Sequence, residues 1–275
     1  MSAVAKTGIP ADPGGTTAFQ VEGLDKVFSA DHGGSEVVAL DAVDLEVGAG
    51  EFVSIVGPSG CGKSTLLDLL AGLLEPTRGR ILLDGKVPGE LLGQLGYMQQ
   101  RDLLMPWRSV LDNTILGLEL GGVGRDAARD RARQELERFG LTGFEDAWPA
   151  ALSGGMRQRA ALLRTFLAGR DALLLDEPFG ALDALTRAEM QRWLLEVWGA
   201  DRKTILLVTH DVDEAILLSD RVYVMSPRPG RVALEVTVEL PRPRVADLAM
   251  TPEFAALKQR LLVPLTDATG LRAVR

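Results

Sequence analysis

Residues 57–65 read GPSGCGKST, in which a glycine is followed by four residues, a second glycine, a lysine and a serine. This spacing matches the phosphate-binding loop of nucleotide-binding proteins. Glycines let the backbone bend until its N–H groups converge on phosphate oxygens, and the helix that follows directs its positive end at the same point. Lys63 would reach the β- and γ-phosphates, and the Ser64 hydroxyl would bind Mg²⁺. An apolar run before the loop and a helical pattern after it argue against a simple glycine-rich turn. We expect nucleotide contacts along the whole loop: Gly57, Pro58, Ser59, Gly60, Cys61, Gly62, Lys63, Ser64 and Thr65.

A pair of acidic residues follows the apolar run ALLL at 172–175. Asp176, at the end of the predicted strand, is placed to hold Mg²⁺, usually through water. Glu177 is one residue further along and could polarise an attacking water as a general base. The alternative is an acidic pair at an ordinary strand exit. The presence of a phosphate loop in the same chain favours the catalytic interpretation.

The segment LSGGMRQR at 152–159 predicts a second anion-binding site. Ser153, Gly154 and Gly155 would lie at a helix N-terminus, with a hydroxyl and amide groups free to hold a γ-phosphate. The alternative is a helix cap followed by an ordinary basic helix. Because the first loop already cradles one nucleotide, a second cradle is best explained if it serves a nucleotide held by another copy of the chain.

Taken together, the motifs resemble those of the nucleotide-binding subunits of ABC transporters, and the resemblance covers about residues 19–240. The motifs occur in the family's order: GPSGCGKST, a Gln loop in YMQQRDLLMPW, LSGGMRQ, LLLDEP, ALDAL and VTHD. Two further segments, LLMPWRSVLDN and DEPFGALDALTR, resemble the ATPases of nitrate, sulfonate and taurine importers and of thiamine-precursor systems.

The resemblance implies roles for further residues. Gln100 would sense the γ-phosphate and Mg²⁺ and face the permease, with the adjacent Gln99 as the alternative. Asp183 would belong to the loop that crosses the dimer contact, and His210 would touch the γ-phosphate and orient the water. Phe28 would stack on adenine, or it would be a core phenylalanine. The predicted catalytic residues are thus Glu177, His210 and Gln100, and the predicted magnesium ligands are Ser64, Gln100 and Asp176.

The function implied by the resemblance is ATP hydrolysis with Mg²⁺ by a head-to-tail homodimer at the cytoplasmic face of a membrane. The dimer would drive integral-membrane permease subunits that receive solute from a periplasmic or lipid-anchored solute-binding protein. The expected cargo is a small anionic or heterocyclic solute such as a sulfonate, taurine, nitrate or a thiamine precursor. Two alternatives are an ABC-type ATPase of DNA repair or ribosomes, and an assembly subunit without turnover. The acidic balance argues against the first, and intact Glu177 and His210 argue against the second.

The elements that must position these residues follow from hydrophobic periodicity. Nearly continuous apolar runs at 52–57, 172–176 and 204–208 are typical of parallel strands buried on both faces. Ligands of such sheets gather at the carboxyl ends of the strands, where the predicted site residues lie. Alternating runs within 19–50 predict antiparallel strands. Residues from about 100 to 165 predict a helical subdomain, with Ser109 capping a helix.

Two more helices carry capping-box patterns, Thr186 with Glu189 and Asp211 with Glu214. The predicted fold class is therefore α/β: a P-loop NTPase core with a mostly parallel sheet, an antiparallel β subdomain and a helical subdomain. We expect a flexible tail at 1–18, the ATP-binding domain at 19–240 and a short C-terminal extension at 241–275. A helix should begin in the extension at Thr251-Pro252.

Composition limits the classes of function. The net charge of −8 over 275 residues argues against a nucleic-acid partner, since phosphate contacts need clustered Lys and Arg. A single cysteine allows no internal disulfide. No segment approaches the roughly 18–20 apolar residues that span a bilayer.

Two features leave alternatives open. Cys61 lies near a predicted helix N-terminus, where a thiolate is favoured, so that alkylation would block ATP binding; alternatively it is an unreactive side chain facing the core. The apolar cluster at 103–107 either accepts a permease helix, with Trp107 on a connection after Pro106, or forms part of a buried helical core.

Overall fold

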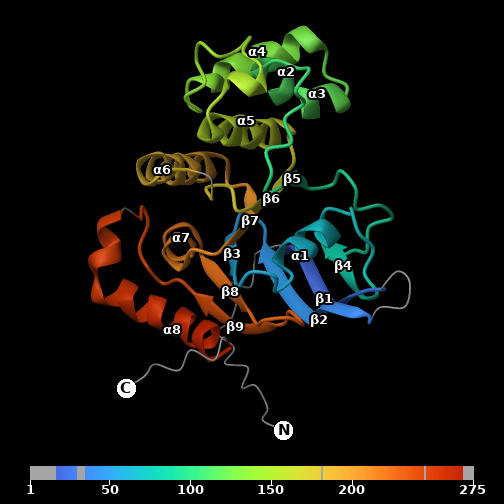
Figure 1. Cartoon of the computed structure of the whole chain (residues 1–275), viewed down its shortest axis with the longest axis vertical. Coiled ribbons are helices and arrows are strands. Elements are labelled where there is room, and N and C mark those ends of the chain that lie inside the picture. Colours follow the sequence, from blue (N-terminus) through green and yellow to red (C-terminus); the bar gives the residue numbers. More distant parts are fainter. Residues whose placement is uncertain (1–16, 30–34, 181, 245, 269–275) are drawn as a thin grey trace.

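The computed structural model describes residues 17–29, 35–180, 182–244 and 246–268. Figure 1 shows two sheets in the lower part of the molecule, with a group of helices above them and a long C-terminal helix at one side. The helices are α1 (Lys63–Leu70), α2 (Val110–Thr114), α3 (Leu116–Leu120), α4 (Arg125–Leu136), α5 (Gly154–Leu167), α6 (Ala184–Asp201), α7 (Val212–Leu218) and α8 (Pro252–Ala268). Short 3-10 turns lie at Pro149–Ala151 and Ala246–Met250. Most of the predicted N-terminal tail, residues 1–16, lies outside the described residues.

The central sheet has six strands and is parallel except at one edge. Its order is β5 (Gly96–Met98), β6 (Ala172–Asp176), β7 (Thr204–Thr209), β3 (Phe52–Val56), β8 (Arg221–Met225) and β9 (Val232–Thr237). Only the pair β8 and β9 runs antiparallel. Every residue of β3, β6 and β7 is buried. This confirms the prediction from continuous apolar runs, which arise because both faces of a parallel sheet are covered.

The second sheet is antiparallel and shares its core with α1. Its order is β2 (Val37–Gly48), β1 (Thr17–Phe28) and β4 (Arg78–Leu83). Phe19 on the middle strand lies opposite Val47 on one side and Leu83 on the other. One buried cluster joins this sheet to α1 and to the central sheet, with members that include Val21, Leu45, Ile55, Leu66 and Leu70. The predicted antiparallel β subdomain is thus confirmed.

Helix α1 ends at Leu70, although apolar residues continue to Leu74. Gly72 adopts the left-handed conformation with φ +73°, and the Leu73 N–H donates to the Asp68 carbonyl at 2.9 Å. This is the pattern of a Schellman motif, which stops a helix whatever the hydrophobicity of the following residues.

Helices α2 to α5 form the helical region predicted near 100–165. The Ser109 hydroxyl accepts a hydrogen bond from the Asp112 amide at 3.2 Å, so the predicted cap is confirmed. The single helix predicted after it is divided at Ile115 into α2 and α3. The Asp112 carboxylate forms ion pairs with Arg125 and Arg129, with N–O distances of 2.6 and 2.8 Å. These ion pairs connect α2 to α4.

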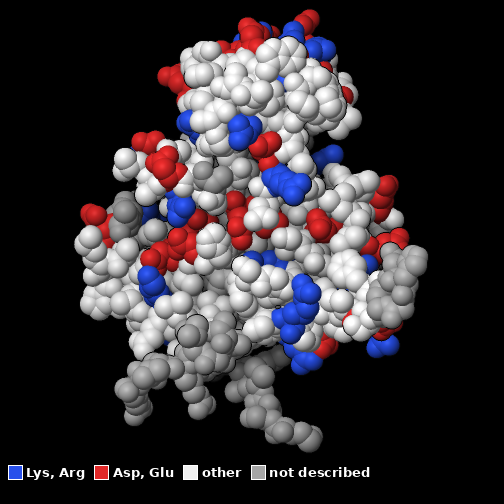
Figure 2. Space-filling model, in the orientation of Figure 1, with Lys and Arg blue, Asp and Glu red and all other residues white. Residues whose placement is uncertain are grey.

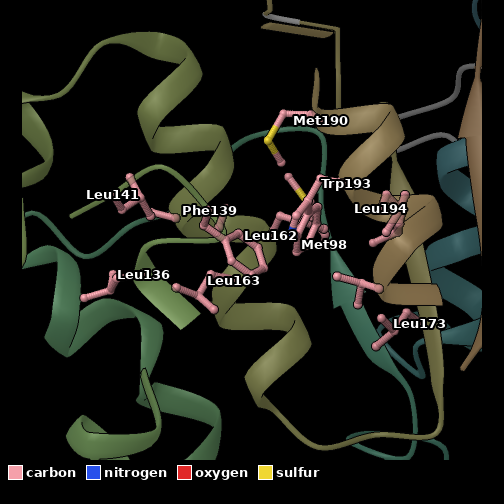
Figure 3. Close-up of a cluster of buried hydrophobic side chains, with 14 of the residues drawn as sticks. Met98, Leu136, Phe139, Leu141, Leu162, Leu163, Leu173, Met190, Trp193 and Leu194 are labelled. Carbon is pink, nitrogen blue, oxygen red and sulfur yellow. The ribbon is translucent and has the colours of Figure 1, made fainter. Parts of the chain in front are cut away.

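An apolar cluster continues from the helical region into α6 and the central sheet. Its aromatic centre is Phe139, just after α4, whose ring centroid lies 4.0 Å from that of Trp193 on α6. Figure 3 shows Leu163 of α5 and Leu173 of β6 on either side of this centre. These residues belong to a single buried cluster. The helical region is therefore packed on the sheet through α5 and α6.

The helix caps differ in part from the sequence pattern. Helix α6 is capped by Asp183, whose carboxylate accepts the amides of the next turn at 3.1 Å. The predicted capping box of Thr186 and Glu189 is wrong, because the aspartate three residues earlier already satisfies those amides. Asp211 caps α7 as predicted. Glu214 does not reach back to it, however, and its side chain is buried.

The C-terminal extension packs on the core through α8 and one buried arginine. Arg244 is buried, and its guanidinium donates to the backbone carbonyls of Ile216, Ser219, Val238 and Leu240. Burial lowers the pKa of Arg244 to about 10, which keeps it charged at neutral pH. The helix predicted from Thr251-Pro252 is confirmed as α8, and its Phe254 and Leu261 are buried beside α7.

Among the described helices, none combines the length and apolarity that a bilayer crossing needs. On the face shown in Figure 2, Lys and Arg are interspersed with Asp and Glu rather than gathered into one continuous basic surface.

Candidate functional site

The predicted phosphate loop connects β3 to α1 and depends on its glycines. Gly62 precedes the helix with φ +106°. A Cβ there would lie 2.7 Å from Leu40 Cδ2 and 3.0 Å from the Ala39 carbonyl oxygen. A Cβ on Gly57 would lie 2.9 Å from the Cys61 sulfur. Larger residues would therefore displace the loop from the sheet that supports it.

Lys63, the first residue of α1, folds back over the loop. Its Nζ donates to the carbonyls of Gly57 and Pro58, at 2.8 and 3.0 Å. No carboxylate among the described residues forms an ion pair with it. The ammonium therefore lies at the loop, with the Asp176 carboxylate as its electrostatic neighbour. This is the arrangement that a phosphate group fits.

The Cys61 thiol faces inward. The residue is 1% exposed and belongs to the apolar cluster around α1. Its position matches the alternative in which the side chain faces the core, although its sulfur lies 3.8 Å from Lys63 Nζ. The reactivity of the thiol stays a prediction. Cys61 would then contact a bound nucleotide through its backbone rather than through its thiol.

A turn far along the chain braces the loop, and the sequence motifs did not reveal it. The Arg228 Nε donates to the Gly60 carbonyl at 3.2 Å. Gly230 approaches so closely that an added Cβ would overlap the Cys61 carbonyl. In the sequence, this segment shows only an Arg-Pro-Gly turn at 228–230.

Asp176 and Ser64 meet beside the loop. Asp176 is buried at the end of β6. Burial raises its pKa, while a hydrogen bond from the Ser64 hydroxyl lowers it and the neighbouring Glu177 raises it further. A buried carboxylate next to a second one is costly unless a cation is near. The oxygen chemistry of this pair fits Mg²⁺, which keeps several waters and uses few protein ligands.

Glu177 brings the three predicted catalytic side chains together. Its Oε2 accepts a hydrogen bond from Gln100 Nε2 at 3.3 Å and lies 3.3 Å from His210 Nδ1. The contact is made by Gln100, whereas Gln99 is half-buried. Glu177 has φ +47°, and its amide donates to the Val208 carbonyl at 2.9 Å. A non-glycine residue in this conformation is strained, and such strain is concentrated at functional sites.

His210 follows β7, and 62% of its side chain is exposed. It borders a small hollow lined also by Glu177, Phe179, Gly180, Arg187, Thr209, Asp211 and Glu214. Thr209, Arg187 and Glu214 were not predicted as site residues. Glu214 was interpreted only as half of a capping box, which hid its position.

Ser153 caps α5, and its hydroxyl accepts the Met156 amide at 3.2 Å. Gly154 and Gly155 form the first turn, and a Cβ on Gly155 would lie 3.1 Å from Leu182 Cδ2. Figure 1 shows α5 in the helical region and α1 beside the core sheets. The two predicted anion sites therefore belong to different parts of the molecule and are not joined in one site of a single chain.

Two aromatic side chains singled out in the sequence, Phe28 and Trp107, are exposed. Phe28 ends β1 and is exposed, so the core alternative is wrong. The Lys26 ammonium lies 5.1 Å from its ring centroid. In the 103–107 cluster, Leu104 is buried, whereas Trp107 is 72% exposed. The cluster thus divides between a core contribution and an open surface.

Comparison with known proteins identifies the family. A model of the ABC transporter family matches residues 40–180, a segment that holds the loop, Gln100, the Ser153 cap and the acidic pair. The chain belongs to the ABC transporter family. An ABC transporter ATP-binding protein of Methanocaldococcus jannaschii is 46% identical over 249 residues, which is 90% of this chain and 91% of that protein. The taurine import ATP-binding protein TauB of Burkholderia pseudomallei is 48% identical over 238 residues, 85% of this chain and 92% of that protein.

Solved structures agree with this ABC transporter assignment. The dimeric post-hydrolysis state of the ATP-binding cassette MJ0796, bound to ADP and Pi, has a TM-score of 0.72 and 30% identity. The matched region covers 81% of this chain and 100% of the MJ0796 chain. The predicted fold class and the ATPase activity of this ABC transporter subunit are thereby confirmed. The roles of individual residues stay predictions.

Proposed function

We propose that the chain hydrolyses ATP with Mg²⁺ as one half of a head-to-tail homodimer that drives a separate permease. The observation that carries this proposal is the convergence of Gln100, Glu177 and His210, within 3.3 Å contacts, beside a phosphate-binding loop. In support, relatives of the chain are named as taurine import ATP-binding proteins.

In the proposed site, Lys63 and the loop amides bind the β- and γ-phosphates. Ser64 and Asp176, with Gln100, would hold Mg²⁺, which neutralises phosphate charge when bound. The described residues contain no group of three or more His, Cys, Asp or Glu side chains able to hold a metal by themselves. The phosphates and water therefore have to complete the coordination, as is usual for Mg²⁺.

Glu177 acts as the general base of the proposed reaction. It orients the attacking water and takes up a proton, and the strained backbone at this residue fixes the direction of the carboxylate. Gln100 and His210 both contact the Oε2 atom of that carboxylate. Phosphoryl transfer needs mainly positioning and charge stabilisation, so three side chains held in contact are suited to the task.

The second anion site is proposed to serve the partner subunit. Ser153 and its two glycines would contact the γ-phosphate bound by the other copy, while Phe28 would stack on adenine. Asp183 caps α6 with its carboxylate, and the loop that it ends would cross the dimer contact. In support, the similar cassette bound to ADP and Pi is dimeric.

Disulfide crosslinking tests this arrangement directly. In a Cys61→Ala, Glu177→Gln background, one preparation carries Ser59→Cys and a second carries Ser153→Cys, since both positions are exposed. We expect the mixture to form a covalent dimer with Mg-ATP, whereas either preparation alone does so far less. If a chain carrying both cysteines crosslinks only within itself, the head-to-tail arrangement is wrong.

We propose import as the direction of transport and the cytoplasmic face of the membrane as the location. The likeness to taurine import proteins supports a small anionic or heterocyclic cargo, such as a sulfonate, taurine, nitrate or a thiamine precursor. The partners are integral-membrane permease subunits and a periplasmic or lipid-anchored solute-binding protein, with no nucleic acid. Purifying the complex and measuring which solute its binding protein holds tests the cargo.

Exposed Trp107 is proposed to contact the permease. Trp107→Ala should lower ATP-driven transport by the assembled complex while ATP turnover by the isolated subunit stays unchanged. Unchanged transport would reject this contact. Trp148→Ala is a matched control, since Trp148 is also exposed and lies outside the 103–107 cluster.

A further inference from the structure

A buried carboxylate lies next to the catalytic group and has no role in the mechanism above. Glu214 is 5% exposed and stands in the first turn of α7, a helix whose other buried residues are apolar. Its Oε2 accepts a hydrogen bond from Gln191 Nε2 at 3.2 Å. Its Oε1 is buried and has no hydrogen-bond partner in the part of the chain that the structure describes. A helix cap does not require such burial.

Glu214 is connected to both neighbours of His210. The Thr209 hydroxyl accepts the Asp211 amide at 3.0 Å. Thr209 lines the same hollow as Glu214, and its hydroxyl lowers the pKa of the Glu214 carboxyl. Asp211 in turn accepts the amides of Asp213 and Glu214, at 2.9 and 3.2 Å. The residues on each side of His210, Thr209 and Asp211, therefore line the same hollow as the Glu214 side chain.

The Glu214 carboxylate contacts α6, the helix that Asp183 caps. Gln191 lies on α6, two turns after that cap, and Arg187 of α6 lies 3.9 Å from the Asp211 carboxylate. The charged and titratable groups that face Glu214 or share its hollow are Asp211, Arg187, His210 and Glu177. On the other side of α7, Asp213 pairs with Lys258 of α8 at 2.8 Å.

We propose that Glu214 is a positioning residue for ATP hydrolysis. Its ionised carboxylate holds Thr209 and, through it, the backbone of His210, so that the imidazole stays against Glu177. Through Gln191 it also couples this backbone to α6, and hence to the loop proposed to cross the dimer contact. The inference rests on the functions proposed above for His210 and Glu177.

The strength of the hydrogen bonds that the Glu214 carboxyl group accepts should depend on pH. Burial raises the pKa of Glu214 to about 7, opposed by hydrogen bonding from Thr209, and the Asp211 charge raises it as well. Below that pH the carboxyl is neutral and accepts hydrogen bonds weakly; above it, the carboxylate accepts them strongly. Turnover should therefore rise with pH through about 7.

The test is steady-state ATP hydrolysis by the purified full chain with Mg²⁺ between pH 6 and 9. Glu214→Gln keeps the shape but stays neutral, so at pH 8 we expect kcat to fall roughly tenfold, the scale of a small misplacement near the reacting groups. KM for ATP should not change, and near pH 6 the variant and the wild type should converge. Glu196→Gln, on the exposed face of the same α6, is the matched control and should follow the wild type throughout.

Thr209→Val provides an independent variant, since valine fills the same buried space without the hydroxyl. It should reproduce the loss at pH 8, and the double variant should lose no more than either single one, because both remove the same link. A wild-type pH profile for Glu214→Gln, or a raised KM with unchanged kcat, would overturn the inference. If Glu177→Gln retains full activity, the proposed function itself fails, and the two results are distinguishable.

Discussion

The burial of Glu214 also predicts how stability changes with pH. Because burial raises the folded-state pKa from 4.5 to about 7, the charged form is disfavoured in the folded chain. The stabilising contribution of the neutral carboxyl is complete below the unfolded pKa and is lost as pH rises through the folded one. At about 1.4 kcal/mol per pKa unit, the full effect is about 3 kcal/mol. Between pH 5 and pH 8, this titration should lower the free energy of unfolding by about 2.5 kcal/mol.

Glu214→Gln removes this titration and leaves other ionisable groups in place. We expect the variant to gain about 2.5 kcal/mol of stability relative to the wild type on going from pH 5 to pH 8. Urea unfolding followed by tryptophan fluorescence at both pH values measures the quantity. Changes in packing caused by the amide cancel, because they are the same at each pH. Glu196→Gln, which is exposed, should show no such change.

An equal stability difference at the two pH values would refute the reasoning. It would mean that the carboxyl is ionised freely in the folded chain and therefore reached by water. The proposed hold on the His210 backbone would then lose its pH dependence, although its geometric basis could still be measured through Thr209→Val.

Three further predictions concern the loop, the base and the C-terminal extension. Glu177→Gln should bind ATP but hydrolyse it at least ~10²-fold more slowly, as expected for a lost general base, and should accumulate as a dimer in light scattering. A monomer at saturating ATP would contradict this. Gly62→Ala should weaken ATP binding in a nucleotide titration, because its Cβ would lie 2.7 Å from a leucine methyl group. Gly85→Ala has positive φ but open space, so it measures backbone strain alone and should leave ATP affinity intact. Arg244→Met should cost at least about 3 kcal/mol in urea unfolding, since several buried carbonyls lose their donor; a loss below about 1 kcal/mol would show that water replaces it.

Much of the architecture could be predicted because its causes are local in the sequence. Continuous apolar runs identified β3, β6 and β7. The phosphate loop was recognisable because glycine spacing reflects the backbone conformation that anion binding needs, and Gly62 at φ +106° is an example. Asp176 and Glu177 could be placed for a similar reason: the carboxyl ends of parallel strands gather at one edge.

What could not be predicted depends on contacts between distant segments. Thr186 fitted a capping box, yet Asp183 caps α6, because two candidate caps compete and only the folded loop decides between them. The contact of Arg228 with the loop joins residues 168 positions apart. Glu214 has the same origin: its burial comes from the packing of α6 on α7, which no local pattern records.

The apolar cluster centred on Phe139 and Trp193 limits how this protein can be dissected. Because the cluster runs without interruption from α4 and α5 into α6 and β6, the helical region is not an autonomous folding unit. A fragment that ends after α5 would expose the face that Trp193 and Leu173 now cover, and it should aggregate. Exchange of this region between homologous subunits would therefore succeed only if α6 is exchanged with it.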